Sequence, residues 1–203
     1  MKKLIIIKYL FLYFLLFSLT LQGPSFSAEK LGEFEIEGIL LKESLLNYFD
    51  KKKIDEKKTK GFIYPKKDFY SVTFSSEKFT TYDKVQFHLK AEDKEYKIYS
   101  LSGQIIYENN IKKCYRDMSV IVSEIKSMFD DPKIIEKGIE SHSRFKDTKV
   151  KTTYIDLRSL NYQEAAIVIE CYDWSELQTK QFGRKDLLSI SVDTKEFYNF
   201  ISN

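Results

Sequence analysis

One long amphipathic segment, residues 111–129, limits what this chain can fold into. Its apolar side chains recur every three or four residues along a single helical stripe that includes Cys114 and Met118. Asn110 is suited to capping the start of such a helix, and the Pro132 that follows Asp131 is suited to ending it. A stripe of this length must be buried, so the segment predicts a helix that lies on a sheet.

Six further stretches alternate apolar and polar residues with the period of two that is typical of β-strands. Three precede the long helix and three follow it: residues 68–75, 84–91, 96–107, 149–158, 164–174 and 186–193. In the second stretch Val85 and Phe87 point to one face, whereas Gln86 and His88 point to the other. Short links join the first three stretches, which predicts an antiparallel sheet with one face in water.

Shorter segments complete the expected order of elements. Residues 33–39 predict a short strand that ends in a turn at Gly38, residues 40–49 and 52–58 predict short helices, and residues 194–201 predict a closing helix. Residues 133–147 are polar and show no regular pattern, so we expect a loop there.

Helices segregated from antiparallel strands indicate an α+β fold. We expect an antiparallel sheet of about six or seven strands, with a long central helix and short terminal helices packed on one face. Residues 28–203 are numerous enough for a single globular domain. The order of elements suggests two degenerate halves, residues 28–109 and 110–203.

The N-terminal segment predicts an export signal. Several lysines open it, and the apolar run at residues 9–21 is too short to span a bilayer comfortably, because spanning takes roughly 20 residues. Small residues precede Ala28, so we expect residues 1–27 to be a signal peptide that is cleaved before Ala28. The expected location is therefore the periplasm. An uncleaved anchor, formed by adding residues 4–7 to the apolar run, is the alternative.

The charge balance argues against nucleic acid as a partner. The whole chain has 33 basic and 30 acidic residues, and the predicted signal holds three of the lysines and no acid. The mature part is therefore formally neutral, with no general positive field to attract nucleic acid or an anionic membrane.

Cys114 and Cys171 are the only cysteines. Both lie on apolar faces that should meet, and two thiols in one exported domain favour a disulfide. Such a bond would close a loop of about 58 residues and contribute roughly 4 kcal/mol through the unfolded state. Two ordinary buried cysteines are the alternative. No cysteine follows the apolar run directly, which excludes a lipid-anchored precursor.

No catalytic, metal or cofactor motif is visible. His88 and His142 are the only histidines, and no spacing joins them to each other or to carboxylates in a known ligand pattern. No serine sits in a G-x-S-x-G turn and no glycine-rich loop is suited to a phosphate. We therefore expect no catalytic residue, cofactor or metal, with both histidines on the surface.

Two patches are candidates for an interaction surface, although solvated charge and the edge of the core are the simpler interpretations. The first is a lysine-rich stretch and the second surrounds the only tryptophan. Their members are Lys51, Lys52, Lys53, Lys57, Lys58 and Lys60, and Tyr172 and Trp174.

Four segments carry a resemblance. Residues 34–39, 44–49, 171–176 and 193–197 together resemble small exported proteins of AT-rich marine bacteria that have no assigned activity. The order of a strand with glycine, two short helices and three antiparallel strands is similar to that in envelope-assembly lipoproteins of the BamE type and in domains of the β-lactamase-inhibitor-protein type. The chain departs from those lipoproteins in lacking their lipid-anchoring cysteine.

These observations favour an exported, periplasmic, non-enzymatic protein that binds an envelope protein or a small ligand. One alternative is a hydrolase-like envelope enzyme whose residues, around His88, His142 and nearby carboxylates, meet only in the folded chain. Another is a protein that contacts the membrane surface through the lysine-rich stretch.

Overall fold

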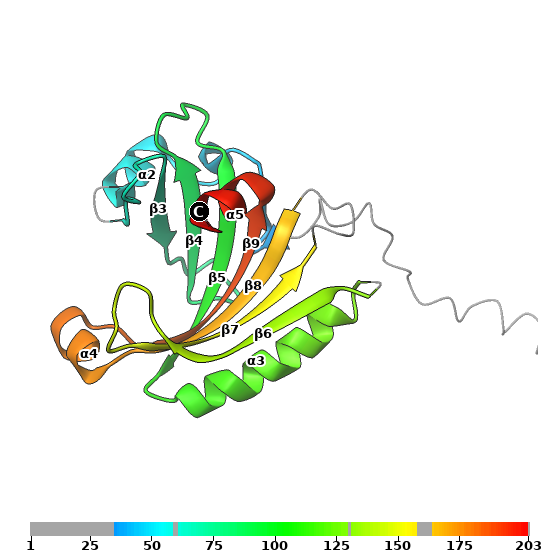
Figure 1. Cartoon of the computed structure of the whole chain (residues 1–203). Helices are drawn as coiled ribbons and strands as arrows, with labels where there is room; N and C mark the ends of the chain where they lie inside the picture. Colours follow the sequence, from blue (N-terminus) through cyan, green and yellow to red (C-terminus); the bar gives the residue numbers. More distant parts are fainter. Residues whose placement is uncertain (1–34, 59–60, 130, 158–163, 203) are drawn as a thin grey trace, which may run out of the picture.

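The computed structural model describes residues 35–58, 61–129, 131–157 and 164–202. Its centre is a seven-stranded sheet in which every pair of neighbours is antiparallel, in the order β3-β4-β5-β9-β8-β7-β6. The strands are β3 (Phe69–Phe74), β4 (Lys84–Lys90), β5 (Ile98–Glu108), β6 (Lys133–Ser141), β7 (Lys149–Asp156), β8 (Glu164–Asp173) and β9 (Asp186–Thr194). The predicted α+β class and the antiparallel sheet are confirmed (Figure 1).

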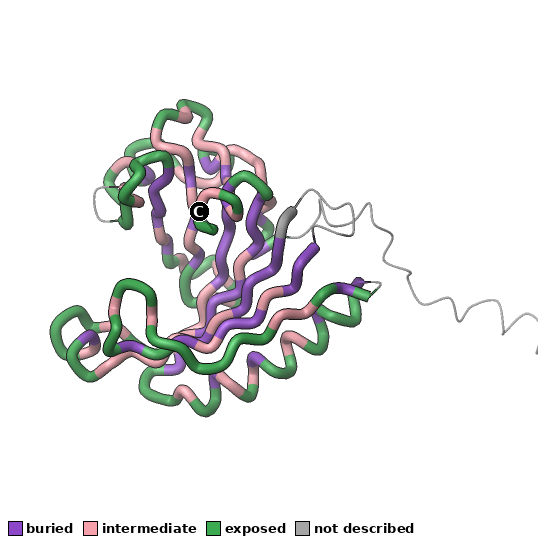
Figure 2. The backbone as a smooth tube through the Cα atoms, in the orientation of Figure 1, coloured by how far each residue is buried: buried purple, intermediate pink, exposed green. Residues whose placement is uncertain are grey.

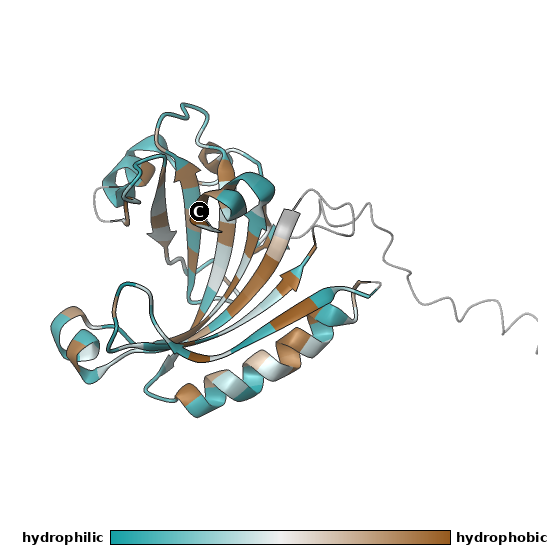
Figure 3. Ribbon diagram, in the orientation of Figure 1, coloured by the Kyte–Doolittle hydropathy of each residue, from teal (hydrophilic) through white to brown (hydrophobic). Residues whose placement is uncertain are grey.

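The helix α3 (Ile111–Lys126) lies along one face of the sheet, which we call the α3 face. The Asn110 side chain accepts a hydrogen bond from the Lys113 N–H, which caps the helix. Buried Met118 and Ile125 pack against residues of β7, β8 and β9, such as Ile167. Figure 3 shows the hydrophilic and hydrophobic sides of this helix.

A second apolar cluster covers the same face over β3, β4 and β5. Its members outside the sheet belong to a small hairpin of β1 (Glu35–Ile36) and β2 (Ile39–Leu40), to a 3-10 turn η2 (Leu45–Asn47) and to α2 (Lys51–Lys58). Leu41 and Tyr82 contact both clusters, so the two parts of the core are continuous.

The helix α5 (Lys195–Ser202) covers the opposite face, which we call the α5 face. Its buried Phe197 stacks on His88, with ring centroids 4.6 Å apart, and contacts Phe69 at 5.3 Å. The prediction that all helices pack on one face is therefore wrong, as is the prediction that His88 faces water. Alternation locates two faces but cannot show what covers the polar one.

The predicted loop at residues 133–147 is also wrong in its first part, which forms the edge strand β6. This strand is mostly exposed, as Figure 2 shows, so it has no buried face to impose alternation. A shift in register between Glu136 and Ile139 breaks the period of two as well. Charges and a bulge are common on edge strands because they oppose pairing with other chains.

Other differences are local. Of the helix expected at 40–49 only the turn η2 forms, and a short helix not predicted from the sequence, α4 (Glu176–Phe182), follows β8. Ser175 caps α4 at its start, and Gly183 ends it with φ 64°, a left-handed conformation that favours glycine. The predicted signal peptide lies outside the described residues. In the part that is described, no helix has the length and apolar character needed to cross a bilayer.

Candidate functional site

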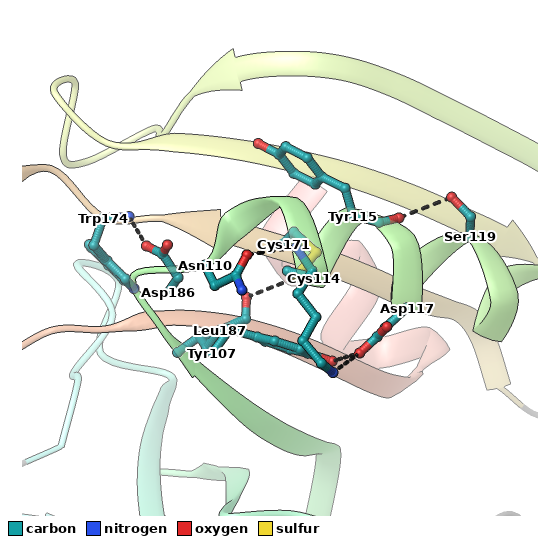
Figure 4. Close-up of a disulfide and its surroundings, with 11 residues drawn as sticks. Tyr107, Asn110, Cys114, Tyr115, Asp117, Ser119, Cys171, Trp174, Asp186 and Leu187 are labelled. Carbon is teal, nitrogen blue, oxygen red and sulfur yellow. Dashed lines mark hydrogen bonds and ion pairs between the residues drawn. A yellow bond between two sulfur atoms is a disulfide. The ribbon is translucent and has the colours of Figure 1, made fainter.

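The predicted disulfide between Cys114 and Cys171 is present, with an S–S distance of 2.00 Å and 6.0 Å between the two Cα atoms. It joins the first turn of α3 to β8 (Figure 4). Both cysteines are completely buried in the apolar cluster of the α3 face. This bond therefore has a structural position, and its sulfur atoms are not exposed to a substrate.

The α5 face, in contrast, contains buried polar side chains. The register places short hydroxyl side chains side by side on β5 and β9, and the hydroxyls of Ser102 and Ser189 are 2.7 Å apart. Ser100 is also buried. Burial of polar groups is costly unless they are hydrogen-bonded, so such a face is unusual for the interior of a small domain. It is the first part of the candidate site.

Glu170 lies on this face in the middle of β8. Thr152 Oγ1 donates a hydrogen bond to Glu170 Oε1 at 3.1 Å, and the Tyr172 hydroxyl donates one to Oε2 at 2.5 Å. Burial raises the pKa of Glu170 despite these two donors. Burial, and then the neighbouring Glu170 carboxyl group, raise the pKa of Tyr172. The site therefore holds a carboxyl group whose charged form is poorly stabilised.

Asp193 carries a further carboxyl group on the α5 face, and its side chain is buried. The Ser100 hydroxyl donates a hydrogen bond to Asp193 Oδ1 at 2.6 Å. Burial raises the pKa of Asp193 to about 7, and the negative charge of Glu170 contributes in the same direction. Glu170 pairs with Ser189, and Asp193 follows four residues further along β9, so about 13 Å separates the two carboxyl-bearing positions along the sheet.

Two tyrosines lie within electrostatic range of both carboxyl groups. Tyr64 reaches the α5 face from the segment beside β3, and its ring is 5.8 Å from that of His88 and 5.9 Å from that of Phe197. Tyr154 projects from β7. Burial raises the pKa of each tyrosine, and Glu170 and Asp193 raise it further. The two tyrosines therefore share the electrostatic environment of the carboxyl groups.

The two histidines belong to different clusters. His88 Nδ1 is buried and has no hydrogen-bond partner among the described residues, and burial lowers the pKa of His88 to about 3. The ring of His142 instead contacts Phe145 and Trp174 at the turn between β6 and β7. The structure does not bring the histidines together, and in the described ranges no three metal-ligating side chains gather.

The lysines of the lysine-rich stretch each make separate local contacts. Lys51 forms an ion pair with Asp55 at 2.6 Å, and Lys53 lies 3.5 Å from Asp50. Lys58 Nζ lies 4.2 Å from the ring centre of Tyr70, whereas Lys57 Nζ lies 5.8 Å from that of Phe74.

Lys52 is exposed on α2 beside a shallow surface pocket that Lys51, Asp55 and Glu56 also line. Lys60 lies outside the described residues. Acidic side chains thus interleave with the lysines.

Tyr172 and Trp174, the other predicted surface, stack on each other with ring centroids 5.7 Å apart. Both rings also contact His142. Because the Tyr172 hydroxyl donates a hydrogen bond to Glu170, this aromatic pair adjoins the Glu170 carboxyl group. The structure therefore links one predicted surface residue to the α5 face.

Glu170 and Asp193 were not recognised from the sequence. Each occupies a polar position of an alternating strand, and such positions usually face water. One signal was available: Glu170 is the single acid within the apolar run of β8, at residues 166–171. A scan against protein-family models, a search of curated proteins and a search of solved structures each found no match.

Proposed function

We propose that this chain is an exported, non-enzymatic binding protein whose α5 face takes a small cationic ligand, an amine. The observation that carries this proposal is the pair of carboxyl groups of Glu170, which is half-buried, and Asp193, which is buried. Within the described ranges, neither forms an ion pair with a lysine or arginine.

The physical reason is the cost of an uncompensated charge. A carboxylate taken out of water is unfavourable by several kcal/mol unless a cation or several donors replace the lost hydration. Here hydroxyl donors replace only part of it, so the pKa of each carboxyl group is raised. A bound ammonium group beside either carboxyl group would supply the missing positive charge and would favour ionisation of that group.

The aromatic rings support a cation in particular. Tyr64, Tyr154 and Phe197 lie on the α5 face, and ring faces attract cations by about 0.5–2 kcal/mol each. The short serine side chains of β5 and β9 add hydroxyl groups that orient a ligand without occupying much space. Carboxylates with aromatic rings form a recognised arrangement for amines.

Export is supported by the disulfide, because such bonds persist in oxidising compartments. It is also consistent with the predicted signal at residues 1–27 and with the resemblance to small exported proteins. A binding role is favoured over hydrolysis, since no nucleophile is hydrogen-bonded to either histidine among the described residues.

The proposal is tested by calorimetric titration of the purified protein with putrescine and with choline, a primary and a quaternary amine. We expect at least one of them to bind, and Glu170→Gln and Asp193→Asn to weaken that binding on the order of tenfold or more. Both substitutions keep the size of the side chain and remove its negative charge.

Glu92→Gln is the matched control, because Glu92 is an exposed acid in the link between β4 and β5. Binding of the amine should be unchanged in this variant. The proposal fails if neither amine binds, or if the two α5-face variants bind as tightly as the Glu92→Gln control.

A further inference from the structure

Two arginines converge on one aromatic cluster at the end of the sheet. Arg184, which follows α4, places its guanidinium carbon 4.2 Å from the ring centre of Trp174 and 4.3 Å from that of Phe145. Arg144, in the turn between β6 and β7, lies 5.3 Å from the same Phe145 ring and 4.9 Å from that of Phe62. Two like charges thus share one aromatic side chain.

Within the described parts of the chain neither Arg144 nor Arg184 forms an ion pair. Burial, and then the charge of Arg144, lower the pKa of Arg184. Burial and the neighbouring cations Arg184, Lys146 and Arg144 lower the pKa of His142. The nearby Asp147 accepts a hydrogen bond from Ser175 at 2.5 Å.

The cluster is held in place by its own contacts. His142 Nδ1 accepts hydrogen bonds from the backbone N–H groups of Arg144 at 3.0 Å and Phe145 at 3.1 Å, which fixes the turn. The Tyr172 and Trp174 rings are nearly parallel, at 12°. A guanidinium group on an aromatic face keeps its N–H donors free in its own plane.

We propose that Arg144 and Arg184 form a binding subsite for an oxyanion, the carboxylate or phosphate group of a ligand. The planar guanidinium group donates two parallel hydrogen bonds to such a group, and an oxyanion would offset the repulsion between the two cations. The subsite is separate from the amine site and does not depend on it. Tyr172 adjoins both, through its hydroxyl at Glu170 and its ring at Trp174.

The single tryptophan of the sequence provides the measurement, because Arg184 lies directly over Trp174. Trp174 fluorescence is followed while the purified protein is titrated with inorganic phosphate and, separately, with acetate. Ionic strength is held constant with sodium chloride. We expect a saturable change with one or both oxyanions, and the stronger response identifies the phosphate or the carboxylate as the preferred group.

Arg144→Gln and Arg184→Gln should each weaken oxyanion binding on the order of tenfold or more. Arg144 is exposed, so its substitution tests the subsite even where loss of Arg184 disturbs the local packing. Arg116→Gln, at an exposed arginine of α3, is the matched control and should bind like the unmodified protein.

The proposal is overturned if neither oxyanion gives a saturable change, if chloride produces the same change, or if Arg116→Gln weakens binding as much as the other two substitutions. Amine binding at Glu170 and Asp193 is measured separately by calorimetry, so failure of the oxyanion proposal can be distinguished from failure of the amine proposal.

Discussion

Asp193 couples the stability of this fold to pH. Its pKa is about 7 in the folded protein and near 3.8 in an unfolded chain. Between these values the folded state keeps a proton that the unfolded state has released, so stability falls as pH rises from 4 to 7 and then levels off. At pH 8 the ionisation of Asp193 lowers the free energy of unfolding by about 4 kcal/mol.

Asp193→Asn should therefore stabilise the protein in alkaline solution. The amide oxygen still accepts the hydrogen bond from Ser100, but the side chain no longer ionises. We expect the variant to equal the unmodified protein near pH 4 and to exceed it by about 2–4 kcal/mol at pH 8. The measurement is urea unfolding at a series of pH values.

His88 does not disturb this comparison. Its pKa of about 3 gives the opposite sign, because the unfolded chain binds a proton below pH 6.5 and the folded one does not. The contribution is the same in both proteins and cancels in their difference. A stabilisation that did not vary with pH would show that Asp193 is not the titrating group. Greater stability together with weaker amine binding is what a functional residue should show.

At the scale of elements, the pattern of apolar residues predicted the helix and strands that pack on the α3 face. The stripe of α3 and the alternation of β4 each place apolar side chains in the core on that face, so pattern and structure agree. β8 is instead an apolar run, because its residues 166–169 are buried on both faces of the sheet. The edge strand β6 has no buried face, and therefore had no pattern to recognise. The position of α5 depends on the contact between the rings of Phe197 and His88, which are far apart in the sequence. Periodicity cannot reveal such a contact.

The candidate site was missed for a related reason. Glu170 and Asp193 occupy polar positions of their strands, yet Glu170 is half-buried and Asp193 is buried in the folded chain. Tyr64, Tyr154 and α5 lie on the same face, an arrangement that the period of a strand cannot show. Cys114 and Cys171 were recognised because both apolar patterns pointed to the same interface.

Loss of the disulfide should weaken the attachment of α3 to β8. The two cysteines are 57 positions apart, and removing a cross-link of this span costs about 4 kcal/mol in the chain-entropy model. We expect the double substitution of Cys114 and Cys171 by alanine to lower the melting temperature by about 8–16 °C. Scanning calorimetry measures the change.

Reducing agent provides the control for the disulfide experiment. It should lower the melting temperature of the unmodified protein only, because the double variant has no bond to reduce. Equal melting temperatures of the two proteins without reductant would contradict a stabilising role for the bond.

At the scale of the whole molecule, strands from both halves of the sequence form one sheet. β5 pairs with β9, and Leu41 and Tyr82 join the two apolar clusters. The arginine cluster, the α5 face and the disulfide are thus all attached to the same strands, β8 and β9. We expect a ligand on the α5 face to stabilise the sheet as a whole.

Export is predicted to leave a mature protein that begins at Ala28. The prediction is checked by expressing the full chain in a bacterium, isolating the periplasmic fraction and measuring the intact mass. A mass that corresponds to residues 28–203, with two fewer hydrogens for the disulfide, is the expected result. Recovery of the uncut chain in the membrane fraction would favour the anchor instead.

The strand order has a consequence for the timing of synthesis. β9 follows every other strand of the sheet in the sequence, yet it lies between β5 and β8, and it brings Asp193 to Ser100, 93 positions earlier. Until β9 is available, the earlier strands form two separate groups that have no common sheet. Such distant pairing makes folding slow. The seven-stranded sheet can therefore be completed only after residues 186–194 have been synthesised.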